Sequence, residues 1–169
     1  MALNIAYSSY LKRQPVLDIF TIALGFVLRI FAGASVMSVP VSSWMFVTGF
    51  TLALYLAAMK RLAELKDTGT ASRAVLTMYS VDLIERFTLI AAISSLTFYS
   101  LFTLTARPEL IVTIPLVLFG IMRYWYVADH LKLGESPTDA LSRDPQLIAT
   151  GVVWLVLVIQ AMQKVAAGS

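Results

Sequence analysis

The chain contains no cysteine and only one histidine, His130. The missing cysteine excludes disulfide bonds and thiolate metal sites, and a lone histidine excludes a site built from several imidazoles. Charge is scarce too, since Asp, Glu, Lys and Arg make up 14% of the 169 residues, against about 25% in an ordinary soluble domain. The sequence also lacks a P-loop and an HExxH pattern, so no such motif identifies a reaction.

The chain consists largely of long apolar segments. It is 59% hydrophobic, with a mean hydropathy of +0.80. Several nearly uncharged windows reach about 20 residues, the length that crosses a hydrocarbon core about 30 Å thick. The sequence therefore predicts an all-α, polytopic membrane protein embedded in a lipid bilayer, with one membrane domain over 1–169. We expect five transmembrane helices at about 15–39, 44–59, 80–104, 110–126 and 146–162, and a remnant of a preceding helix at 1–11.

Helix ends can be predicted from single residues. Pro15 suits a first helical turn, because its missing N–H has no partner there in any case. Ser80 is expected to cap the 80–104 helix, and Asp82 suits the positive end of that helix dipole. Trp44 and the run 124–126 (Tyr-Trp-Tyr) are typical of membrane interfaces. Residues 163–169 are expected to fray.

The charges favour one side of this bundle. If five helices alternate in direction, ten of the 13 Lys and Arg residues fall on one side, Arg107 and Lys164 fall on the other, and Arg29 lies within the membrane. Of the ten acidic residues, nine fall on this same side and only Glu109 falls on the other. The excess of Lys and Arg predicts that this side is cytoplasmic.

The densest charge cluster is 60–67, at the end of the second apolar segment. Lys60 and Glu64 are four residues apart and share a helical face. They could form a surface salt bridge worth a few tenths of a kcal/mol. Alternatively, Lys60 and Arg61 could donate charge-assisted hydrogen bonds to phosphate beside an acid that binds Mg²⁺ or a sugar hydroxyl. The spacing leaves both readings open.

Arg29 is the charge placed deepest in an apolar segment. It follows Asp18 by 11 residues, close to three helical turns, so the two are expected on one face. An arginine at this depth must face a bundle interior or a wet cavity. It is either a structural arginine bonded to helix carbonyls or a group that faces an anion.

Several separated motifs, in order, resemble the UbiA prenyltransferase superfamily, and within it the branch of decaprenyl-phosphate phosphoribosyltransferases. The resemblance covers nearly the whole chain. It rests on Tyr7-Ser8, Leu11-Lys12-Arg13, Gly25-Phe26-Val27-Leu28-Arg29, Lys60-Arg61-Leu62-Ala63-Glu64-Leu65, Arg73 through Tyr79-Ser80, Arg123-Tyr124 and Arg143-Asp144-Pro145.

The resemblance implies a reaction. Such enzymes transfer 5-phosphoribosyl from phosphoribosyl diphosphate to a polyprenyl phosphate in the bacterial inner membrane, with Mg²⁺, to supply cell-wall arabinan precursors. By this resemblance Glu64 is the expected catalytic residue. The expected phosphate-binding residues are Lys60 and Arg61 first, then Lys12 and Arg123, then Arg29 and Tyr79. No residue is assigned as a metal ligand, and no nucleic acid is expected as a partner.

The resemblance is also incomplete. Members of the superfamily form bundles of about nine helices, and the Asn-Asp-x-x-Asp-x-x-x-Asp motif that binds Mg²⁺ in them does not occur here. The chain is therefore expected to be a C-terminal portion, inactive without an N-terminal half. Two alternatives remain. One is a UbiA-type prenyltransferase with an aromatic acceptor, which would need a second Asp-rich motif at 60–67. The other is a non-enzymatic scaffold or transporter component.

Overall fold

A computed structural model describes residues 14–36, 42–68, 78–130 and 142–168. These residues form five long α-helices and one 3₁₀ helix, with no strand among them. The long helices are α2 (Leu17–Val36), α3 (Ser43–Thr68), α4 (Val81–Ala106), α5 (Ile114–His130) and α7 (Pro145–Gly168), and the 3₁₀ helix is η3 (Pro108–Thr113). Five stretches are long and apolar enough to cross a membrane. The predicted polytopic helical bundle is confirmed.

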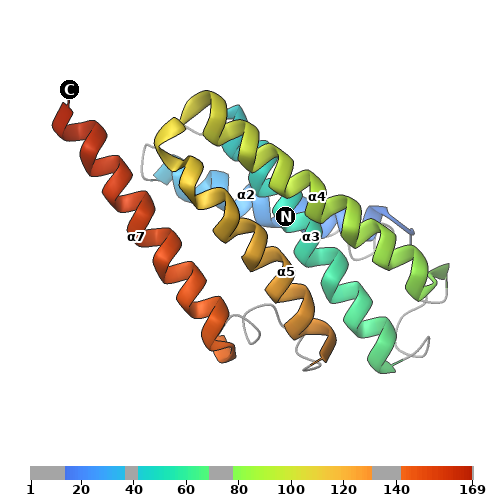
Figure 1. The fold of residues 1–169 in the computed structure, drawn as a ribbon. Helices are drawn as coiled ribbons and strands as arrows, with labels where there is room; N and C mark the ends of the chain where they lie inside the picture. Colours follow the sequence, from blue (N-terminus) through green and yellow to red (C-terminus); the bar gives the residue numbers. More distant parts are fainter. Residues whose placement is uncertain (1–13, 37–41, 69–77, 131–141, 169) are drawn as a thin grey trace.

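Helix α3 lies at the centre of the packing. It contacts α4 and α2 most extensively, whereas α7 packs mainly on α5 (Figure 1). The buried face of α3 carries Ala57, Ala58, Met59 and Leu62, each 2% exposed. Small residues allow neighbouring helices to approach closely within a membrane. This close packing buries the stretch of α3 that leads into its charged end.

The start of α2 differs from the prediction. Pro15 was expected in the first helical turn, but the helix begins at Leu17 and Pro15 lies in a turn. Val16 has a φ of 69°, a left-handed conformation that a β-branched residue rarely adopts. The Leu17 N–H donates to the Pro15 carbonyl at 2.8 Å. This local break delays the helix by two residues.

The end of α3 was also predicted too early. The second apolar segment was expected to stop at residue 59, yet α3 continues through the charged cluster to Thr68. Leu62 and Leu65 keep the apolar face in register, at 2% and 7% exposed. Arg61 and Glu64 on the same stretch are paired inside the protein. The charges therefore sit on the helix itself.

Helix α4 begins as predicted. The Ser80 hydroxyl accepts a hydrogen bond from the Leu83 N–H at 3.2 Å, which caps the helix. Its other end reaches Ala106, where Arg107 leaves the helical conformation and Pro108 opens η3. A proline fits there because the first N–H of a helix needs no internal partner.

The last two helices end later than predicted, and α5 also begins later, because residues 108–113 form η3. The 110–126 helix was expected to end at 126, but α5 runs to His130. The 146–162 helix was expected to fray from 163, but α7 continues to Gly168. Tyr124 does not form an outward belt, because it is 3% exposed and packs edge-on against Tyr55, with 5.8 Å between ring centroids. The first helix was expected to reach 39, and residues 37–39 lie outside the described residues.

Candidate polar site at one end of the bundle

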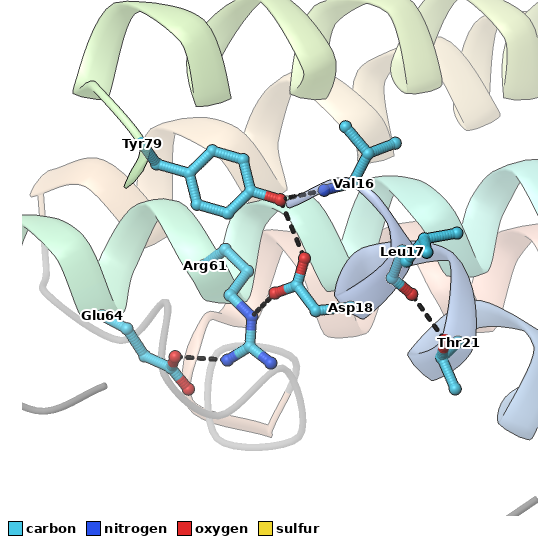
Figure 2. Close-up of polar contacts among 7 residues, drawn as sticks. All are labelled: Val16, Leu17, Asp18, Thr21, Arg61, Glu64 and Tyr79. Atoms are coloured by element: carbon cyan, nitrogen blue, oxygen red, sulfur yellow. Dashed lines mark hydrogen bonds and ion pairs between the residues drawn. The ribbon is translucent and has the colours of Figure 1, made fainter. Parts of the chain in front are cut away.

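Four polar side chains from distant parts of the sequence meet inside the bundle. Asp18 comes from the first turn of α2, Arg61 and Glu64 come from the last third of α3, and Tyr79 lies just before the Ser80 cap of α4 (Figure 2). Because the helices alternate in direction, these positions lie at the same end. We call these four residues the Arg61 cluster.

Arg61 links the two carboxylates of the cluster. Its Nε donates to Asp18 Oδ2 at 2.8 Å, and its Nη1 pairs with Glu64 Oε2. Arg61 is 1% exposed and Asp18 is 0% exposed. A buried charge is tolerated only when it is paired and hydrogen-bonded, and removing one partner is costly. The cluster therefore holds α2 and α3 together at this end.

Tyr79 completes the surroundings of Asp18. Its hydroxyl donates to Asp18 Oδ1 at 2.8 Å and accepts from the Val16 N–H. Burial raises the pKa of the Tyr79 phenol, so the hydroxyl keeps its proton and remains a donor at neutral pH. The unusual conformation of Val16 points its N–H at this oxygen. Both carboxylate oxygens of Asp18 thus accept a hydrogen bond.

The predicted site residues do not all converge. Arg61, Glu64 and Tyr79 meet in the cluster, while Lys60 lies beside it, partly exposed. The predicted Lys60–Glu64 pairing is replaced by Arg61–Glu64, three residues apart. Among residues 14–36, 42–68, 78–130 and 142–168, Lys60 has no ion-pair partner. Lys12 lies outside the described residues. Arg29 is exposed on α2, about three turns along the helix from buried Asp18, so a shared helical face does not bring the two side chains together.

Arg123 takes part in a separate contact. Its Nε and Nη2 donate to the two oxygens of Asp144, at 3.2 Å and 2.7 Å. Asp144 in turn accepts from the Leu147 N–H at 2.9 Å, at the start of α7. The Arg123 hydrogen bond holds the pKa of Asp144 below its usual range. The pair joins the second half of α5 to the start of α7.

A third group of charges joins the same ends of α3, α4 and α5. Lys66 Nζ lies 3.0 Å from Glu85 Oε1 and 2.6 Å from Asp129 Oδ1. All three side chains are roughly 40% exposed. Exposed pairs of this kind are individually weak. The contacts show that these three helix ends lie beside one another.

Sequence reasoning left Asp18 and Asp144 out of the candidate site. Asp18 carried a usable signal, since an acid within an apolar segment is a functional hypothesis by default. Asp144 lies two residues before the predicted helix start at 146, near the position where an acid commonly caps a helix. Neither signal identified Arg61 or Arg123 as the partner, because the pairs are 43 and 21 residues apart.

The donors present do not fit Mg²⁺. No three Asp, Glu or His side chains come together in the part of the chain that has been described. Asp18 and Glu64 are both committed to Arg61. Mg²⁺ prefers carboxylate oxygens combined with water and substrate phosphate. The described donors of this chain therefore do not form a Mg²⁺ site.

Comparison with known proteins finds several relatives that share one name. No protein-family model matches the chain. A decaprenyl-phosphate phosphoribosyltransferase of Mycolicibacterium smegmatis is 28% identical over 171 residues, covering 92% of this chain. The proteins of the same name from Mycobacterium tuberculosis and Corynebacterium glutamicum are 27% and 25% identical, covering 94% and 96%. The chain spans about half the length of these curated relatives, 52–54%.

Proposed function

We propose that the chain is part of a UbiA-type membrane transferase that moves 5-phosphoribosyl from phosphoribosyl diphosphate to a polyprenyl phosphate. The observation that carries this proposal is the similarity to phosphoribosyltransferases along 92–96% of the chain. In the proposed step an oxygen of the lipid phosphate attacks C1 of the ribose, and the bond from C1 to the diphosphate oxygen breaks. Diphosphate leaves as an anion. The product would feed cell-wall arabinan synthesis.

The geometry divides the roles of the two adjacent cations. Arg61 is 1% exposed and already binds two carboxylates, so a substrate phosphate has little access to its remaining N–H donors. Lys60 is partly exposed next to it. Lys60 is therefore the better candidate for holding the donor phosphates, and Glu64 remains the proposed contact to the ribose hydroxyls. Arg61 would act by positioning Glu64.

The proposal includes a second polypeptide segment. The metal that such a reaction uses has no site among the residues described above, so an Asp-rich Mg²⁺ motif would have to come from elsewhere. The charged ends would face the cytoplasm of a bacterial inner membrane, where phosphoribosyl diphosphate is available. This orientation follows from the excess of Lys and Arg on that side.

Binding of phosphoribosyl diphosphate tests the proposal. The purified chain in lipid nanodiscs with excess MgCl₂ is titrated by calorimetry, and Lys60→Ala is expected to weaken binding about tenfold, because one charge-assisted hydrogen bond is lost. Lys164→Ala, at the opposite end of the bundle, is the matched control and should bind as the wild type does. Equal affinity for both variants would rule out Lys60 as a contact to the donor phosphates.

A transfer assay tests the need for a second segment. The purified chain alone, given labelled donor and polyprenyl phosphate, is expected to form no phosphoribosylated lipid. Product formed by the chain alone would contradict the need for a separate Asp-rich segment.

A further inference from the structure

Arg29 lies on a face of α2 that no other described helix covers. Helix α2 packs mainly against α3, and its inward residues Ala23 and Val27 are 0% and 3% exposed. Arg29 points away from that contact and is exposed. Among the residues with described positions it has no ion pair. Its guanidinium carbon lies 5.8 Å from the centroid of the Phe26 ring.

This contact places the charge near the middle of the membrane. Phe26 lies nine residues after Leu17 and ten before Val36, the two ends of α2. At 1.5 Å per residue, those ends are about 14 Å and 15 Å away, and the hydrocarbon core is about 30 Å thick. Side chains on a helix lean toward its N-terminus, so Arg29 reaches back over Phe26 and away from the nearer end at Val36.

A guanidinium at this depth needs a partner. It keeps its proton in proteins, and charged groups within a membrane pair with other groups or face water. Space for a partner exists, because a Cβ added at Gly25 or Gly33 would meet nothing within 4 Å. Both glycines are close to Arg29 on the helix, and small residues permit close helix approach.

We infer that the Arg29 face of α2 seats another transmembrane helix that carries an Asp or Glu near the middle of its span. A second copy of this chain does not supply that acid, since the acidic residues of its described helices all lie in the outer thirds. A lipid phosphate sits at the membrane surface, outside the hydrocarbon core. In the curated relatives about half of the protein lies outside the matched stretch, which is ample length for such a helix.

Site-specific photo-crosslinking tests this inference. Phe26, 47% exposed, is replaced by benzoylphenylalanine in the full chain, in membranes of the source organism. The same label at Ile93 of α4, 57% exposed, is the control for a helix surface elsewhere. Peptide sequencing by mass spectrometry identifies the adduct. The expected adduct at position 26 lies in a transmembrane helix with a central Asp or Glu, and it is absent at position 93.

Charge variants then separate specific docking from chance proximity. Arg29→Glu should lower the crosslinked fraction about tenfold, Arg29→Lys should retain most of it, and replacing the partner's acid by Lys should restore crosslinking to Arg29→Glu. A crosslink to a second copy, to lipid alone, or to the same helix regardless of charge would overturn the inference. The readout needs no sugar phosphate, so this inference and the proposed function can fail separately.

Discussion

Asp18 of α2 connects to two other parts of the chain, and each of its two carboxylate oxygens binds a different partner. Its Oδ2 binds Arg61 on α3, and its Oδ1 binds the Tyr79 hydroxyl ahead of α4. Because both groups are buried, losing the carboxylate leaves a guanidinium with one partner fewer and no water to replace it. The two contacts differ in kind, since one is an ion pair and the other a hydrogen bond from a neutral donor.

Asp18→Asn is therefore expected to destabilise the protein by about 3 kcal/mol, as when one partner of a buried ion pair is removed. Tyr79→Phe removes only a hydroxyl and should cost about 1 kcal/mol. Unfolding equilibria in bicelles measure both. Asp82→Asn is the matched control, because the Asp82–Arg86 pair is 73% and 71% exposed, and it should cost under about 0.5 kcal/mol. Similar losses for Asp18→Asn and Asp82→Asn would contradict a buried ion pair.

The Arg123–Asp144 pair predicts that the stability of the folded protein depends on pH. The hydrogen bond from Arg123 lowers the pKa of Asp144 below its ordinary value of 3.8. A carboxyl with a lower pKa in the folded state stabilises the protein above the unfolded-state value, and that contribution is lost as the pH falls through the folded-state value. Thermal stability of the wild type should exceed that of Asp144→Asn by a constant margin above about pH 5.

The margin between these two proteins should shrink below pH 3.8, as Asp144 takes up its proton. Glu109→Gln, at the opposite end of the bundle, serves as the control for general acid effects. A margin that persists unchanged to pH 3 would show that Asp144 acts through its shape and not through its charge.

The sequence shows which residues of 60–67 are charged, but it could not predict how they pair. Helix geometry allows both Lys60–Glu64 and Arg61–Glu64, because residues three and four apart are neighbours. The choice depends on where α2 places Asp18, which attracts Arg61 inward. That position is a tertiary property, and no local pattern carries it.

At the scale of helices, the ends were predicted best where one residue acts locally. Ser80 caps α4 through its own side chain, so the sequence was sufficient. The end of α3 was missed because hydropathy falls at Lys60 while the helix continues to Thr68. Burial of Arg61 with its partners keeps the helix regular, and hydropathy does not record such pairing.

Gly120 sets the contact between α5 and α7. A Cβ added there would lie 3.7 Å from Cγ2 of Thr150, whereas one at Gly151 would meet nothing within 4 Å. Gly120→Ala should fit, but Gly120→Leu should force the helices apart and cost about 1–3 kcal/mol. Thermal unfolding in detergent measures this cost. Gly151→Leu is the matched control for the change in helix propensity, and an equal cost at both sites would rule out a packing effect.

At the scale of the whole molecule, the two ends of the bundle differ in charge. The Arg61 cluster, the Arg123–Asp144 pair and the Lys66 group share one end, whereas Arg107 and Glu109 lie at the other, 3.4 Å apart. The sequence predicted this segregation from helix alternation alone. It could not predict that three separate groups of ion pairs would form at the charged end, because their partners come from different helices.

Sidedness can be tested directly because the chain has no cysteine. Ser142→Cys marks the charged end and Glu109→Cys marks the other. A membrane-impermeant maleimide added to intact spheroplasts should label Glu109→Cys and leave Ser142→Cys unlabelled until the membrane is opened. The expectation follows from the retention of Lys and Arg on the cytoplasmic side. The reverse labelling pattern would place the charged end outside and remove access to a cytoplasmic donor.

The order of Asp18 and Arg61 along the chain has a consequence for synthesis. Asp18 precedes Arg61 by 43 residues, which a ribosome adds in about 2–9 seconds at 5–20 residues per second. During that interval Asp18 is already part of the chain, so Arg61 never precedes the acid that it pairs with. When Arg61 emerges, its counter-ion is already in place. The cluster can therefore assemble without the Arg61 guanidinium entering the membrane ahead of its acid.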